Sequence, residues 1–187
     1  RQAARQGPFR GWEDFNAEEH EGLGIYQVTQ CNGERWSAAR AYVHPHMGKR
    51  ANLRVETEAY ATRILFEGNR AVGVKYRQGD EVKEIRARRE VILAAGAFQS
   101  PQLLMLSGVG DQADLAKRGI ASVHHLPGVG QSLQDHPDFI FSYKSDNPNF
   151  TSMSLKGIGR ILSGIAQYRR ERRGRMTSNF AECGGFL

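Results

Sequence analysis

A short and continuously apolar run constrains the fold of this chain more than any other feature. Val91-Ile92-Leu93-Ala94-Ala95 contains no polar position, a pattern typical of a parallel strand that is buried on both faces. Gly96 ends the run, and Ser100 and Pro101 then supply a helix N-cap and a proline at the first helical position, which predicts a helix over 102–106. Strand, glycine turn and helix in this order predict part of an α/β nucleotide-binding fold, whose ligand lies at the carboxyl end of the strand.

The stretch before this run is predicted to be β-structure. Three segments, 59–66, 71–76 and 82–87, are rich in apolar and β-branched side chains and are separated by glycine-containing turns. Strands joined by such tight turns predict an antiparallel β-meander. A further short strand is expected at 53–55.

The remaining patterns predict short elements and one domain boundary. Strands are expected at 24–30, 121–125 and 139–143, and helices at 38–43, 111–118 and 155–170. The string that begins at Gly108 matches GxGxxA, but it follows a predicted helix instead of a strand, so no complete dinucleotide fingerprint is assigned. Because the composition changes near residue 137, we expect one domain over 1–137 and the beginning of a second over 138–187.

Composition and charge exclude several classes. The chain has 187 residues, 40% of them hydrophobic and 25% charged, which argues against a disordered, collagen-like or disulfide-scaffold protein. No apolar run approaches the roughly 20 residues of a membrane span. The net charge of +6 is concentrated at Arg169–Arg175. We interpret this patch as a solvated helix end; binding of phosphates or of an anionic membrane is the alternative, and no nucleic-acid partner is expected.

Cysteine and histidine residues predict no metal site. Cys31 and Cys183 lie far apart without a CxxC pattern, as expected of a reduced, cytosolic protein. The six histidines lack a carboxylate or cysteine at a spacing that completes a ligand set. Asp135 and His136 could form an acid/base pair, but sequence neighbours rarely face one substrate, so a structural role is favoured.

The small residues Ala94, Ala95 and Gly96 have two interpretations. A cofactor could approach the backbone closely at the end of the strand, because any larger side chain would fill the space. Alternatively, small side chains simply allow close packing of a helix on a strand. Physical reasoning from these residues alone leaves both open.

An ordered series of motifs is similar to a known family. The string from Gly96-Ala97-Phe98-Gln99-Ser100-Pro101 to Gly108-Val109-Gly110 closely resembles the second signature of the glucose–methanol–choline (GMC) flavoprotein oxidoreductases. The strings at 33–42, 52–57, 63–68 and 126–137 also resemble the middle region of that family. The resemblance covers about residues 15–187 and is nearest to the choline dehydrogenase and alcohol dehydrogenase branch.

The resemblance implies a fold and a function. The expected fold class is α/β, and α+β in part: a fragment of an FAD-binding Rossmann-like domain with an antiparallel β-meander, followed by the start of a sheet-and-helix substrate domain. The implied reaction is oxidation of a primary alcohol, choline-like or aliphatic, to the aldehyde with hydride transfer to FAD. The family's N-terminal GxGxxG and its C-terminal catalytic histidine have no match here. We therefore carry over no catalytic residue and expect the chain, as a central fragment, to be inactive alone.

The resemblance also implies four cofactor-binding residues. Backbone groups at Ala61 are expected to contact the adenine, and Ala94, Ala95 and Gly96 to lie beside the adenosine half of FAD. Ser132 stands where the family often has asparagine, so the hydrogen bond of that amide is not carried over.

Partners and location follow from the same resemblance. We expect a small-molecule alcohol substrate, an electron acceptor that the sequence does not name, and a cytoplasmic protein that is either free or peripheral at the inner membrane. The alternative function is a non-catalytic binding module derived from the middle of a flavoprotein. Nucleic-acid binding through Arg169–Arg175 ranks below both.

Overall fold

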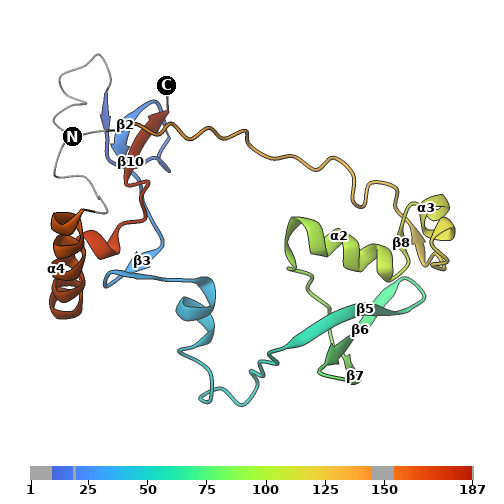
Figure 1. Cartoon of the computed structure of the whole chain (residues 1–187). Helices are drawn as coiled ribbons and strands as arrows, with labels where there is room; N and C mark the ends of the chain where they lie inside the picture. Colours follow the sequence, from blue (N-terminus) through green and yellow to red (C-terminus); the bar gives the residue numbers. More distant parts are fainter. Residues whose placement is uncertain (1–9, 19, 145–153, 187) are drawn as a thin grey trace. The chain divides into compact units, whose positions relative to one another are not determined.

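The computed structural model describes residues 10–18, 20–144 and 154–186, and it contains two compact units. One unit runs through Leu53 and resumes at Ser142, and the other is Arg54–Phe141. Figure 1 shows the helices and strands of both units. The predicted boundary at 137 divides a cofactor-binding domain from a substrate-binding domain. The two compact units are defined by contacts and not by ligands, so that boundary stays a prediction.

The unit Arg54–Phe141 is built on the β-meander that the sequence predicts. Strands β5 (Ala59–Glu67), β6 (Arg70–Gln78) and β7 (Glu81–Arg86) form an antiparallel sheet in the order β5-β6-β7 (Figure 1). Two-residue turns connect them, and each turn begins with a glycine at positive φ, a conformation that glycine adopts without steric cost. The three predicted strands are thereby confirmed.

A β-bulge interrupts β5 close to its start. Ala61 pairs with Tyr76 and Arg63 pairs with Lys75, so Thr62 is an extra residue in the ladder. The Thr62 hydroxyl donates to the Lys75 carbonyl at 3.2 Å. Bulges bend a strand and disrupt its ladder locally, so the backbone beside Ala61 departs from regular pairing.

Helix α2 spans Gly96–Leu106 and packs against β5. The prediction of a helix over 102–106 was therefore wrong about the start, because Pro101 lies inside the helix instead of at its first position. Ser100 does serve the helix start, but from within: its hydroxyl accepts a hydrogen bond from the Ala95 N–H at 3.1 Å. Gly108, with a φ of 92°, follows the helix end as expected.

The apolar run Val91–Ala95 is not a strand, which corrects the expectation that it is buried on both faces. The side chain of Ile92 is 79% exposed, and no described segment pairs with the run. Apolar composition shows that a segment can be buried, but a strand also needs neighbours to hydrogen-bond with. For the same reason the strands expected at 53–55 and 139–143 are absent from the described structure.

Two short strands and a helix complete this unit. Strand β8 (Val109–Gly110) pairs in parallel with β9 (His124–His125), and α3 (Gln112–Lys117) lies between them in sequence. The Asp111 carboxylate caps α3 by accepting a hydrogen bond from the Asp114 N–H at 3.0 Å. The helix predicted over 111–118 is thus confirmed. The buried apolar side chains of the described structure all lie in this unit, on β5, β6, α2, β8 and α3: Ile64, Tyr76, Leu103, Val109 and Leu115.

The other unit joins segments from opposite ends of the chain. Strand β2 (Gly22–Ile25) pairs in parallel with β1 (Gly11–Trp12) and antiparallel with β10 (Cys183–Phe186). A hairpin of β3 (Gln30–Cys31) and β4 (Glu34–Arg35) follows, so the strand predicted over 24–30 is confirmed only at its ends.

Helices and one 3₁₀ turn complete the same unit. A π-helical turn, η1 (Ala39–Val43), replaces the predicted α-helix over 38–43. Helix α4 (Leu155–Glu171) confirms the prediction over 155–170 and leads to the 3₁₀ turn η2 (Arg175–Thr177). Within the described ranges, none of the helices combines the length and apolar character that crossing a membrane requires.

Candidate functional site

A pocket of about 240 Å³ lies between the start of β5 and helix α2. Strand β5 supplies one wall, and the N-terminal approach and inner face of α2 supply the other. Its lining consists of short or uncharged side chains: Ala59, Tyr60, Ala61, Ala95, Gln99, Gln102, Leu103 and Leu106.

The chemistry of this lining suits a flat, uncharged, hydrogen-bonding group. Alanine side chains leave the backbone open to close approach, and the Tyr60 ring is largely exposed and can stack. The amides of Gln99 and Gln102 can each donate and accept hydrogen bonds. No lining residue carries a charge, so the pocket is not built for a phosphate.

The structure brings together two of the four residues that the sequence predicts to bind a cofactor. Ala61 of β5 and Ala95 before α2 line the same pocket, although they are distant in sequence. Ala94 and Gly96 flank Ala95 and are exposed. A Cβ placed on Gly96 would meet no atom within 4 Å. In the described structure neither Ala94 nor Gly96 is packed between a helix and a strand.

One residue beside the pocket was missed by sequence reasoning. Ser107 follows the last residue of α2 and is buried, with 4% of its surface exposed. Its hydroxyl accepts a hydrogen bond from the Ile64 N–H at 2.8 Å and donates one to the Leu103 carbonyl at 2.5 Å. The sequence offers one signal, a serine directly before Gly108 at the end of the helix. Hydrophobic periodicity alone does not indicate that this serine is buried.

A second pocket, of about 270 Å³, lies beside α3 and has a charged rim. Asp111, Asp114 and Arg118 lie around an otherwise mostly apolar lining. Lys117 donates a hydrogen bond to the Asp114 carboxylate at 2.8 Å, and this bond holds the pKa of Asp114 below its ordinary value and the pKa of Lys117 above its own. Asp111 caps α3 and Asp114 pairs with Lys117 of the same helix, so both carboxylates stabilise the helix.

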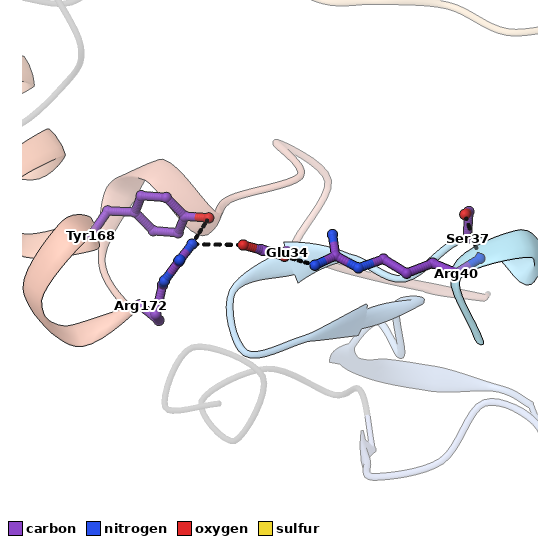
Figure 2. A network of polar contacts seen from close by, with 5 residues as sticks. All are labelled: Glu34, Ser37, Arg40, Tyr168 and Arg172. Carbon is purple, nitrogen blue, oxygen red and sulfur yellow. Dashed lines mark hydrogen bonds and ion pairs between the residues drawn. The ribbon is translucent and has the colours of Figure 1, made fainter. Parts of the chain in front are cut away.

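An ion-pair network links three elements of the other unit (Figure 2). Glu34 is the first residue of β4, beside the hairpin turn. Its carboxylate accepts a hydrogen bond from Arg172 at 2.6 Å and forms an ion pair with Arg40 of η1. Arg172 also donates to the Tyr168 hydroxyl at 3.0 Å. The Tyr168 hydroxyl and the Glu34 carboxylate both raise the pKa of Arg172 above its ordinary value. The Glu34 carboxylate is paired on both sides, so we interpret the network as a structural clasp between the three elements.

The hairpin can approach this clasp only because of a glycine. Gly33 has a φ of 69°, and a Cβ there would overlap the carbonyl oxygen of Arg172. Gly33 follows Asn32, whose φ is 50°, so the two-residue turn has the conformation that favours Asn-Gly. The turn sequence thus also determines how close β4 lies to the end of α4.

Histidine and cysteine side chains form no chemical centre in the described structure. His125 accepts a hydrogen bond from the Gln112 N–H, and the contact between Asp135 and His136 involves the backbone N–H of His136. Cys31 and Cys183 are exposed and free. No three His, Cys, Asp or Glu residues of the described part are grouped as metal ligands.

A comparison with protein families decides the family. The family model for GMC oxidoreductases matches residues 1–138. The chain belongs to the GMC oxidoreductase family. This confirms the resemblance that the sequence motifs carry.

Curated relatives of this GMC chain include enzymes of the expected branch. It is 47% identical over 176 residues to the alcohol dehydrogenase (acceptor) of Pseudomonas putida, covering 93% of this chain and 32% of that protein. It is 41% identical over 186 residues to the human mitochondrial choline dehydrogenase, covering 100% of this chain and 31% of that protein. The chain therefore spans about a third of the length of these relatives.

Solved structures of GMC flavoproteins share the fold. An FAD-dependent oxidoreductase from Chaetomium thermophilum matches with a TM-score of 0.78 and 26% identity, over 94% of this chain and 31% of that one. A formate oxidase matches with a TM-score of 0.80 and 26% identity, over 98% of this chain and 32% of that one. The predicted mixed α/β fold class is confirmed, and FAD is the cofactor of the family to which the chain belongs.

Proposed function

We propose that this chain forms the adenosine-binding wall of an FAD-dependent enzyme that oxidises a primary alcohol, choline-like or aliphatic, to the aldehyde. The observation that carries the proposal is the pocket between β5 and α2, which unites Ala61 and Ala95. Homology to alcohol and choline dehydrogenases supports the substrate class. When bound, FAD supplies the hydride acceptor that no amino-acid side chain can provide.

The residues present fit the adenosine end of that cofactor. Short side chains at Ala61 and Ala95 leave room for a purine, the amides of Gln99 and Gln102 can hydrogen-bond with its edge, and Tyr60 offers an aromatic face. None of these groups is an acid or base. They bind and orient, so substitutions here should change FAD affinity before they change the chemical step.

We propose no residue of this chain as the base that takes the proton of the alcohol. No catalytic residue is carried over by the family motifs, and no described histidine is paired with a carboxylate side chain as a base would be. We therefore propose that the 187-residue polypeptide by itself does not oxidise alcohols. Turnover of an alcohol with an artificial electron acceptor, above that of a heat-killed control, would contradict this proposal.

The test of the pocket is to fill it. In the complete natural polypeptide that carries this sequence, Ala61→Trp should block the pocket and reduce the FAD bound per protein, read from flavin absorbance, by about tenfold. Ala116→Trp on the exposed face of α3 is the matched control and should retain FAD. Full FAD content in A61W would exclude this pocket as the adenosine site. If the unsubstituted protein binds no FAD, a non-catalytic binding module becomes the better explanation.

Location and electron acceptor extend the same proposal. We place the protein in the cytoplasm, with peripheral contact to the inner membrane as the alternative. Two exposed apolar side chains of α4, Leu155 and Leu162, and the arginines in the last turn of the same helix support membrane contact. Fractionation tests it: recovery in the soluble fraction supports free protein, and a membrane fraction released by high salt supports peripheral attachment.

A further inference from the structure

Ser107 occupies an unusual position for a polar residue. Among the described residues, Ser107 is the one polar residue that is buried, with 4% of its surface exposed. Its hydrogen-bond partners are the backbones of Ile64 and Leu103, which are also buried. Buried hydroxyl groups are costly unless they are paired, and this one both donates and accepts. A small apolar residue would fill the same space without that requirement, so the hydrogen bonds need an explanation.

The bond to Ile64 satisfies a donor that the sheet leaves unpaired. Strand β5 lies at the edge of the described sheet β5-β6-β7, so its outward N–H groups have no strand partner. Ser107 accepts the N–H of Ile64, and Arg63 donates from its side chain to the Leu106 carbonyl at 3.3 Å. Consecutive residues of β5 are thereby joined to the C-terminal end of α2.

These bonds join the two walls of the pocket. Leu103, whose carbonyl accepts from Ser107, and Leu106, whose carbonyl accepts from Arg63, both line the pocket. Ile64 lies on the same strand as Ala61, beyond the bulge at Thr62. Apolar contact between strand and helix tolerates sliding, whereas a hydrogen bond has a preferred length and direction.

We propose that Ser107 is a positioning residue that sets the spacing between β5 and α2, and through it the fit of the adenosine group of FAD in the pocket. The proposal rests on the function proposed above. In this role Ser107 touches neither the cofactor nor the substrate. It acts by holding the strand that carries Ala61 at a fixed distance from the helix that carries Gln99 and Gln102.

Binding of two ligands separates positioning from general stability. In apoprotein of the complete natural polypeptide, Ser107→Ala leaves the Ile64 N–H unpaired and should raise the Kd for FAD and for ADP by a similar factor, about tenfold. Ser107→Thr keeps the hydroxyl and should restore affinity to within about threefold of the original. Ser163→Ala, which removes an exposed hydroxyl of α4 bonded to the Arg160 carbonyl, is the matched control and should leave both Kd values unchanged.

A second variant keeps the test decisive if S107A does not fold. Ser107→Cys has nearly the same shape but is a weak hydrogen-bond acceptor, and it should also weaken FAD and ADP binding. Unchanged Kd values in the folded S107A or S107C protein, with only a lower stability in denaturant, would overturn the positioning role.

The outcomes distinguish this inference from the proposed function. If A61W loses FAD but S107A and S107C bind it normally, the pocket assignment stands and the role of Ser107 is wrong. If A61W retains FAD, the pocket assignment fails and the inference fails with it. Weaker ADP binding that S107T restores supports both.

Discussion

Two glycines with positive φ follow helices α2 and α3. Gly108 has a φ of 92°, and a Cβ there would lie 2.5 Å from the Ala121 carbonyl oxygen. Gly119, which ends α3, has a φ of 69°, but a Cβ there would meet no atom within 4 Å. The two glycines share a left-handed conformation and differ in the space around them, so they separate backbone strain from steric overlap.

We therefore predict unequal costs for two alanine substitutions. Gly119→Ala introduces only the left-handed strain and should lower the free energy of unfolding by about 1 kcal/mol. Gly108→Ala adds overlap with a backbone oxygen that cannot move freely and should cost about 3 kcal/mol. Denaturant unfolding of the two variants measures the difference. Equal costs would show that the turn after α2 relaxes easily.

The charge pair on α3 predicts a pH dependence. The hydrogen bond from Lys117 lowers the pKa of Asp114 in the folded chain, so the folded state binds this proton less readily than the unfolded state. The contribution of the pair is complete above the unfolded pKa, near about 3.9, and is lost as the pH falls through the folded value.

Asp114→Asn removes this titrating group and tests the direction in which stability changes with pH. Between about pH 6 and about pH 3, stability should fall less steeply in D114N than in the unsubstituted protein. Lys117→Gln should flatten the profile in the same direction, because it removes the cause of the shift. Parallel profiles for all three proteins would argue against a pair that survives in solution.

At the scale of elements, the Glu34 clasp joins the hairpin, η1 and the end of α4 (Figure 2). Glu34→Gln leaves Arg40 and Arg172 facing each other without a carboxylate, so it should lower stability. The deficit should shrink as salt is raised from about 0.05 M to about 1 M, because salt screens the repulsion. Glu90→Gln, at an exposed carboxylate that has no ion pair within the described residues, is the control. A deficit that is independent of salt would mean that the contact is not electrostatic.

Elements also show where local sequence information suffices. The three strands of the meander and helices α3 and α4 were predicted because each has its own signals: glycine turns for the strands, Gly119 for the end of α3, and the amphipathic pattern for α4. The structure adds side-chain caps at Asp111 and Ser154. The run Val91–Ala95 has the composition of a buried strand but no strand partner in the described structure. The start of α2 was predicted too late because Pro101 was taken as the first helical position. Proline is favoured in the first turn of a helix, but it does not have to be the first residue.

At the scale of the whole molecule, strand β10 pairs with β2 from the other end of the chain. Cys183 is the register partner of Ile25, and cross-strand Cα distances of about 4.5–5.5 Å lie within the range of a disulfide. In a Cys31→Ser background, Ile25→Cys should form an intramolecular disulfide with Cys183 on mild oxidation. Mass spectrometry detects it as the loss of two hydrogen atoms.

The control for this pairing is a cysteine outside the ladder. Val28→Cys in the same background is also exposed but has no strand partner in register, so it should stay reduced under the same oxidation. Equal oxidation of I25C and V28C would show that the chain ends do not pair in the register described here.

The sequence by itself determined the β-meander, helices α3 and α4, the family, and two of the eight residues that line the candidate pocket. Periodicity, caps and turn residues act between neighbours along the chain, so they predict the meander and α4, and the ordered motifs from Gly33 to Pro137 identify a GMC oxidoreductase. Only the tertiary structure decided which small residues share a pocket, that Ser107 joins its walls, and that β2 pairs with β10. These facts depend on hydrogen bonds between segments distant in sequence, and no local pattern encodes which distant partner a donor will meet.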